Sequence, residues 1–183
     1  MSYFPIHTLK SAPEASKQSL EALQSIFGFI PNIAGAMSTS SVLINSLVPV
    51  FGNVHDGSFT EQQIQTVLLT NAVTNASTWP VAFHTFLALK NGVTPADVEA
   101  VRNGDLPKDP KLAALSRLAK TLIEKRGRLN AHDKDVFFQA KFGPDHLLEV
   151  VTIVAASTIT NYTGSVTQPP LEKDFQEHTW SAQ

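Results

Sequence analysis

The sequence of 183 residues contains six scattered histidines and no cysteine. The histidines are therefore the main candidates for catalytic or metal-binding side chains. The absence of cysteine excludes disulfides, thiolate metal sites, iron–sulfur clusters and thiol nucleophiles. No two histidines are spaced as ligands on one helix, so we expect no metal site and no cofactor. His132 lies beside Asp133 and Asp135 at a polar helix start, where capping and solvation explain it better than a metal does.

His84 is the one histidine in an apolar setting, between Phe83 and Phe86 in the middle of an expected helix. A buried imidazole is costly unless it has a hydrogen-bond partner. His84 is therefore either a core residue that donates to a nearby carbonyl or a functional residue. The chain has no phosphate-binding glycine loop, dinucleotide fingerprint, Gly-x-Ser-x-Gly elbow or His-Glu-x-x-His pair, which disfavours the common motif-bearing enzymes.

The elements that would position His84 are all expected to be helices. Start and stop signals recur along the chain, and no sustained apolar/polar alternation typical of strands is present. Capping-box patterns stand at 11–14 and 60–63, and Pro49 predicts a kink or an early stop. Helices are predicted at about 14–27, 41–51, 61–75, 78–91 and 131–141. A short helix is predicted after residue 31, two more are predicted to start at 95 and 110, and a long one is predicted after residue 144.

The long helix after residue 144 is apolar almost all round, which predicts a buried helix in the core or in a subunit interface. It is too short and too often interrupted by polar residues to be a membrane span of about 20 apolar residues. Pro169 and Pro170 then lead into a polar tail, 171–183, which carries Phe175 and Trp180. We expect this tail to be flexible or to dock an aromatic side chain onto a neighbouring subunit.

Length and composition predict one all-α domain over 1–183, because a chain with 43% hydrophobic residues can bury one sizeable core. The formal net charge is −2, with 14 basic and 16 acidic residues, so nucleic acid and anionic membranes are not expected as partners. The first residues lack the basic and apolar pattern of a secretory signal, and we therefore expect a cytoplasmic protein.

Residues 75–85, NASTWPVAFHT, resemble the Cys-x-x-Cys-x-x-x-His helix start of the AhpD-like alkylhydroperoxidase and carboxymuconolactone decarboxylase family. Residues 27–34, FGFIPNIA, resemble that family's Phe-Gly-x-x-Pro-Asn entry, and further stretches fit in the expected order: 91–94, 148–151, 160–162 and 170–171. The resemblance covers most of the chain. It implies an AhpD-like helical bundle that assembles as a homotrimer or as a homohexamer of dimers.

The resemblance also implies a site, in which a dithiol at a helix start reduces a peroxide while a glutamate and a histidine relay protons. Ser77 and Pro80 stand in this chain where the two cysteines belong, and Gln65 stands where the glutamate belongs. His84 is kept, and Ser165 replaces a histidine that many relatives carry after Asn-Tyr. Serine and proline cannot cycle through a disulfide, and glutamine cannot accept a proton at neutral pH. The family's thiol mechanism is therefore predicted to be absent.

Three functions follow from this resemblance and its departures. The first is a small-ligand-binding or vestigial-site oligomer that is inactive as an alkylhydroperoxidase. The second is a cofactor-free decarboxylase or lactone-processing enzyme with His84 as general acid or base and with Ser77, Trp79 and Gln65 shaping the pocket. The third is redox chemistry through a bound metal or a partner's thiol. By family alone the chain would be classed as an alkylhydroperoxidase-type oxidoreductase. Its residues do not decide whether it is an enzyme at all, because the thiol mechanism is predicted to be absent.

Overall fold

The structure is a computed structural model that describes residues 3–182, and helices are its only regular elements over that range. The expected all-helical fold is thus confirmed. Nine α-helices and one 3₁₀ helix follow one another in the described residues: α1 Glu14–Phe27, α2 Asn32–Met37, α3 Ser41–His55, α4 Glu61–Thr74, α5 Thr78–Lys90, α6 Pro95–Arg102, α7 Pro110–Glu124, α8 Ala131–Gln139, α9 Pro144–Thr167 and η1 Lys173–His178.

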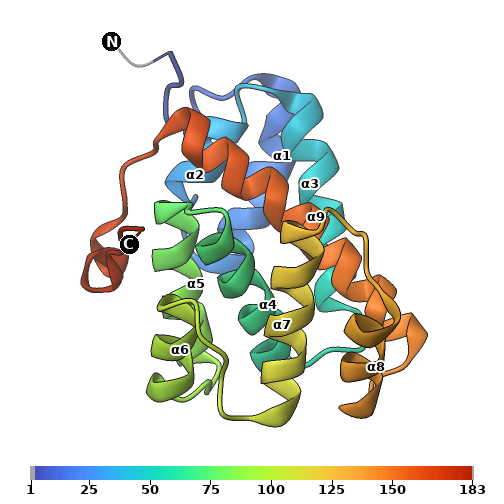
Figure 1. Ribbon diagram of the computed structural model, residues 1–183. Coiled ribbons are helices and arrows are strands. Elements are labelled where there is room, and N and C mark those ends of the chain that lie inside the picture. Colours follow the sequence, from blue (N-terminus) through green and yellow to red (C-terminus); the bar gives the residue numbers. More distant parts are fainter. Residues whose placement is uncertain (1–2, 183) are drawn as a thin grey trace.

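Helix α4 is the centre of the fold. Every residue from Ile64 to Ala72 is buried, so α4 is covered on all sides although its sequence has no strong apolar stripe. It packs against α5, α7 and α9. The other helices surround it, with α1 to α3 on one side, α5 and α6 on a second, and α7 and α8 on a third (Figure 1). Polar residues of α4 therefore face neighbouring helices and must find partners there.

Several helix ends follow the local signals in the sequence. The Thr60 side chain accepts from the Gln63 backbone while the Gln63 side chain accepts from the Thr60 backbone, which confirms the predicted capping box. Gly28 ends α1 in the left-handed conformation, at a φ of 81° that glycine adopts without steric cost. Asn130 and Asp133 form a further capping box at the start of α8. The capping expected near His132 is therefore made by its neighbours.

Two predicted helix ends are wrong. Pro13 rather than Ser11 precedes α1, and the Ser11 hydroxyl accepts from the Thr8 backbone in a preceding turn, so the capping box at 11–14 does not form. Helix α3 continues through Pro49 to His55. Pro49 is exposed, so its ring lies on the outer side of α3 and the helix continues past it.

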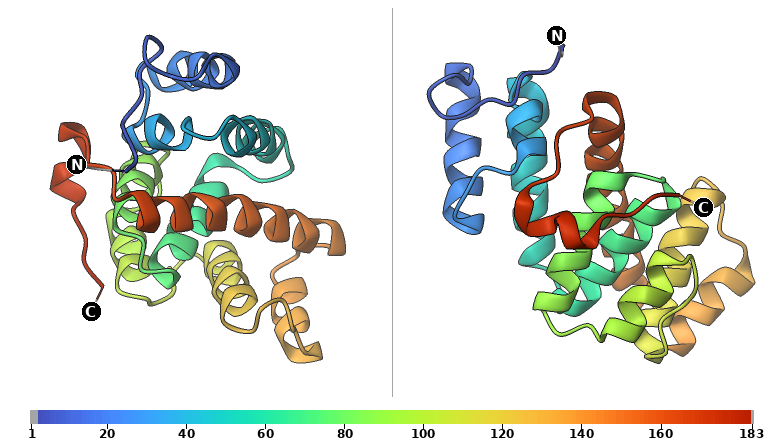
Figure 2. Two further views of the ribbon diagram at one scale, coloured as in Figure 1. Left: turned by 90° about the horizontal axis from the view of Figure 1, so that it is seen from above. Right: turned by 90° about the vertical axis from the view of Figure 1, so that its left-hand side faces the viewer.

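Helix α9 has one buried face and one exposed face. Val150, Ile153 and Ala156 belong to the core, whereas Leu148 and Tyr162 are 66% and 62% exposed. Of the two predicted alternatives, burial of the whole helix in the core of one chain is wrong, and burial in a subunit interface stays a prediction. Viewed from above, α9 crosses the molecule without any ribbon over it (Figure 2, left). No helix in residues 3–182 combines the length and the hydropathy that crossing a membrane would need.

The tail that follows α9 lies across α5 of its own chain (Figure 2, right). Phe175 in η1 is 1% exposed and packs against the rings of Phe83 and Phe86, with centroids 5.3 and 5.2 Å away. The Trp180 indole N–H donates to the Arg102 carbonyl at 3.0 Å. In a single copy the tail therefore places its aromatic side chains on its own chain, the expectations of a flexible or subunit-docking tail stay predictions, and Gln183 lies outside the described residues.

Candidate functional site

His84 and Gln65 face each other between α5 and α4. The His84 Nδ1 atom lies 3.0 Å from Gln65 Oε1, and the two residues are 4% and 2% exposed. An amide oxygen can only accept a hydrogen bond, so Nδ1 carries the imidazole proton and Nε2 keeps its lone pair. The Gln65 side chain of α4 and the His84 side chain of α5 are thus hydrogen-bond partners of each other, and a buried histidine needs such a partner.

Burial determines the charge of His84. Removal from water, together with the smaller effect of the charge of His55 at the end of α3, lowers the pKa of His84 from 6.5 to about 3. His55 itself lies 2.7 Å from a carboxylate oxygen of Glu61. The His84 imidazole is therefore neutral at pH 7. The neutral ring lacks the acidic second proton of an imidazolium, so it is a poor general acid, and its low pKa makes it a weak base.

Ser77 precedes α5 but does not cap it with its side chain. Its hydroxyl instead donates to the backbone carbonyl of Asn161 on α9 at 3.1 Å, and the residue is 1% exposed. A Cβ atom on Gly164 would come within 3.3 Å of Ser77 Oγ and 3.5 Å of Pro80 Cδ, so glycine allows α9 to approach the start of α5 closely. The positions of the two family cysteines are thus occupied by the α5–α9 contact.

Trp79, between those two positions, turns toward the tail. Its indole N–H donates to a carboxylate oxygen of Glu172 at 3.0 Å, and its ring stacks on Phe83 with centroids 5.0 Å apart. The other oxygen of Glu172 accepts from the Asn32 backbone at 2.6 Å, at the start of α2. One carboxylate therefore joins α5, α2 and the tail over the start of α5. No local pattern in the sequence predicts this role of Glu172.

An asparagine cluster beside Ser77 is the other feature that sequence reasoning missed. The Asn161 amide donates to Asn71 Oδ1 at 3.0 Å, the Asn75 amide donates to the same oxygen, and the Asn71 amide donates to the Val154 carbonyl. Asn161 Oδ1 is buried without a protein donor among the described residues. Ser165 Oγ donates to the Asn161 carbonyl at 3.0 Å. The only sequence feature that points to this cluster is the presence of Asn71 and Asn161 in otherwise apolar helices.

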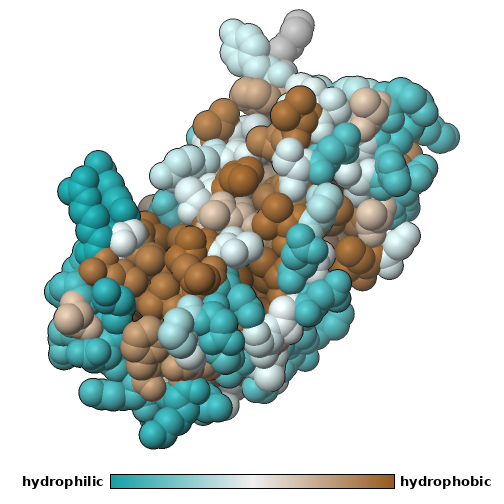
Figure 3. Space-filling model, turned by 90° about the vertical axis from the view of Figure 1, so that its right-hand side faces the viewer, coloured by the Kyte–Doolittle hydropathy of each residue, from teal (hydrophilic) through white to brown (hydrophobic). Residues whose placement is uncertain are grey.

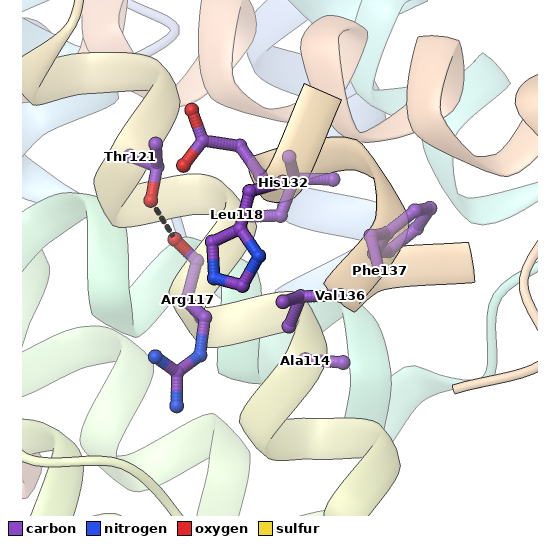
Figure 4. Close-up of a pocket in the computed structure, with 8 residues that line it drawn as sticks. Ala114, Arg117, Leu118, Thr121, His132, Val136 and Phe137 are labelled. Carbon is purple, nitrogen blue, oxygen red and sulfur yellow. Dashed lines mark hydrogen bonds between the residues drawn. The ribbon is translucent and has the colours of Figure 1, made fainter. Parts of the chain in front are cut away.

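The predicted site residues thus fall into two groups. Gln65 and His84 form one pair, whereas Ser77, Trp79 and Pro80 contact α9 and the tail. A hollow of about 120 Å³ lies elsewhere on the described surface, between α7 and α8 (Figure 4). Arg117 and His132 stand at its polar side and Phe137 at its apolar side. Residues 3–182 include no cluster of three side chains suited to hold a metal ion.

Solved structures with the same fold were found by comparison of the whole chain. An alkylhydroperoxidase AhpD core protein from Ralstonia eutropha JMP134, described as an uncharacterized peroxidase-related protein, superposes with a TM-score of 0.83 at 16% identity, over 95% of this chain and 94% of that one. The chain has the AhpD fold. This confirms the fold that the sequence resemblance implied. The dithiol of that resemblance is absent, because the chain has no cysteine.

Two further structures share this AhpD fold. An uncharacterized peroxidase-related protein from Silicibacter sp. TM1040 has a TM-score of 0.76 at 13% identity, over 94% of this chain and 92% of that one. The debrominase Bmp8 has a TM-score of 0.76 at 12% identity, over 90% of each chain. No family profile and no curated protein sequence matches the chain. At these identities the likeness establishes the fold alone.

Proposed function

We propose that this chain is an AhpD-fold homo-oligomer whose former active site is vestigial and does no thiol chemistry. The observation that carries the proposal is that the polar side chains at three of the family's catalytic positions, Gln65, Ser77 and His84, are buried and engaged with protein. The Ser77 hydroxyl is bonded to a backbone carbonyl and His84 to the amide of Gln65. Such groups stabilise the packing of α4, α5 and α9, and they offer no nucleophile and no redox couple.

The chemistry of peroxide reduction supports the same conclusion. Reduction of an organic hydroperoxide to an alcohol and water takes two electrons, which a dithiol supplies when it is oxidised to a disulfide. The chain has no sulfur other than that of its two methionines, and a thioether cannot form a disulfide. A small organic ligand, the other partner considered, would have to enter beside two residues that are 4% and 2% exposed, so we favour a vestigial site over a ligand-binding one.

Pure, demetallated protein should not consume organic hydroperoxide. In an assay with dihydrolipoamide as reductant, we expect the rate to equal that of hydroperoxide and dithiol alone, because no protein group can relay the electrons. Peroxide loss is followed against protein concentration, with an AhpD-fold protein that has the Cys-x-x-Cys pair as the positive control. A rate that rises in proportion to the amount of this chain would overturn the proposal.

The second candidate is a cofactor-free lactone-processing enzyme, and the free lone pair on His84 Nε2 favours it. A base needs such a lone pair within reach of substrate, and the Gln65 contact fixes the tautomer that provides it. The low pKa of His84 opposes the role of a general acid at pH 7. Turnover of a lactone acid that His84→Ala abolishes without disturbing assembly would support this candidate over a vestigial site.

A further inference from the structure

The outer face of α9 is largely apolar and carries no charge after its first two turns, which contain Asp145 and Glu149. Ile159 is 41% exposed and Val166 is 66% exposed, in addition to the exposed Leu148 and Tyr162 described above. No charged residue occurs between Glu149 and Glu172. Helices that face water normally carry charged side chains on that face. Apolar surface also gathers on the side of the molecule where α3, α8 and the first half of α9 lie (Figure 3).

Six exposed residues of this face follow a heptad pattern. They succeed one another at alternating steps of about four and three residues, as the a and d positions of a coiled coil do. The pattern is the same when it is read from either end. It therefore fits a second α9 that runs in the opposite direction. We name this set the α9 seam: Leu148, Thr152, Ala155, Ile159, Tyr162 and Val166, all exposed.

Side-chain size distinguishes the two possible directions of pairing. In an antiparallel pair centred on residue 157, Ala155 lies opposite Ile159 and Thr152 lies opposite Tyr162, so a small side chain meets a large one at each inner position. In a parallel pair each residue meets its own copy, which sets Tyr162 against Tyr162 and leaves a gap at Ala155. Well-packed interfaces place large side chains opposite small ones, because voids forfeit contact energy.

We propose that two copies of this chain associate through the α9 seam, antiparallel and about a two-fold axis near residue 157. The interface is isologous, so each contact occurs twice. The inference rests on the homo-oligomer in the proposed function and defines one of its interfaces. Of the two assemblies that the family resemblance implies, a hexamer of dimers contains two-fold axes and a trimer does not. The seam therefore favours the hexamer or its dimer.

In the proposed pair, a groove at the Val166 end of the seam would accommodate Leu148 of the second copy. It has a volume of about 290 Å³, lies between α9 and the α2–α3 region, and is lined mainly by apolar side chains such as Met37, Leu43 and Val166. Leu148 of the second copy would lie opposite Val166, and its side chain would enter this groove. The groove and the seam thus form one continuous surface with a single occupant.

Cross-linking tests the direction and register of the pair, and the absence of native cysteine makes every introduced thiol unique. The Leu148→Cys/Val166→Cys variant should form a covalent dimer under mild oxidation. Each single variant should stay uncross-linked, because the same position in the two copies would be about 27 Å apart along the helix axis. In the double variant, the two thiols of one helix are also about 27 Å apart and cannot bond to each other. Ile26→Cys, an exposed thiol on α1, measures random cross-linking. Cross-linking of the single variants, or none in the double variant, would overturn the proposal.

A charge at the centre of the seam should separate the copies. The wild-type mass in light scattering should be at least twice the 19.9 kDa of one chain. Ile159→Arg should raise the dissociation constant on the order of 100-fold or more, because an unpaired charge would be buried against Ala155 of the second copy. Ile26→Arg is the matched control, and helix content by circular dichroism verifies folding. A monomeric wild-type protein would refute the seam and leave the hydroperoxide result untouched.

Discussion

Acidification from pH 7 to pH 4.5 should remove about 2.5 kcal/mol of unfolding free energy through His84 alone. The folded-state pKa of His84 is lowered from 6.5 to about 3, so between these values the unfolded chain binds a proton that the folded chain does not. The contribution of His84 to stability is complete above pH 6.5, declines as the pH falls, and is fully lost near pH 3. The neutral imidazole donates to Gln65, whereas its charged form is buried without a carboxylate partner.

Urea unfolding of the wild type and of His84→Gln at the two pH values measures this contribution. The variant keeps a polar side chain at position 84 but cannot be protonated, so its stability should fall by about 2.5 kcal/mol less than that of the wild type. His132→Gln removes an exposed histidine and serves as the control, with an acid response close to that of the wild type. Equal losses in the wild type and in His84→Gln would show that His84 already reaches water in the folded protein.

Replacement of Phe175 by alanine should lower the unfolding free energy by about 3 to 4 kcal/mol. The Phe175 ring is 1% exposed and has four aromatic neighbours, and its loss leaves a cavity that the rigid α5 cannot fill. For a chain of this length the melting temperature should fall by roughly 10 °C. Differential scanning calorimetry gives both quantities.

Tyr3→Ala is the matched control for Phe175→Ala, because Tyr3 is 93% exposed. Its stability should stay within about 0.5 kcal/mol of the wild type. A loss of less than about 1 kcal/mol in Phe175→Ala would mean that the tail leaves α5 in solution. The contacts of Glu172 with Trp79 and Asn32 would then contribute little to the folded state.

The sequence predicted the elements that depend on local signals. The capping box at 60–63 and the helices at 14–27 and 78–91 each depend on residues within a few positions of one another. The exceptions also have local causes. Pro13 displaced Ser11 as the residue that starts α1, and Pro49 is tolerated because it faces water. The family resemblance then gave the correct fold.

The surroundings of the candidate site could not be predicted, because they depend on contacts between distant segments. Ser77 bonds to a residue 84 positions away, Trp79 to one 93 positions away, and Asn32 to one 140 positions away. No periodicity or spacing encodes such pairs. The α9 face illustrates a further limit, since an apolar sequence predicts that a surface is covered but not whether the same chain or a second copy covers it.

The role of His84 is tested most directly by nuclear magnetic resonance of its imidazole in ¹⁵N-labelled protein, with His84→Gln to assign the signals. If the family's catalytic positions now serve the packing of the helices, the ring keeps its proton on Nδ1, donates it to Gln65, and shows no protonation from pH 7.5 to 4.5. An imidazole that titrates near pH 6.5 and exchanges rapidly with water would contradict the account.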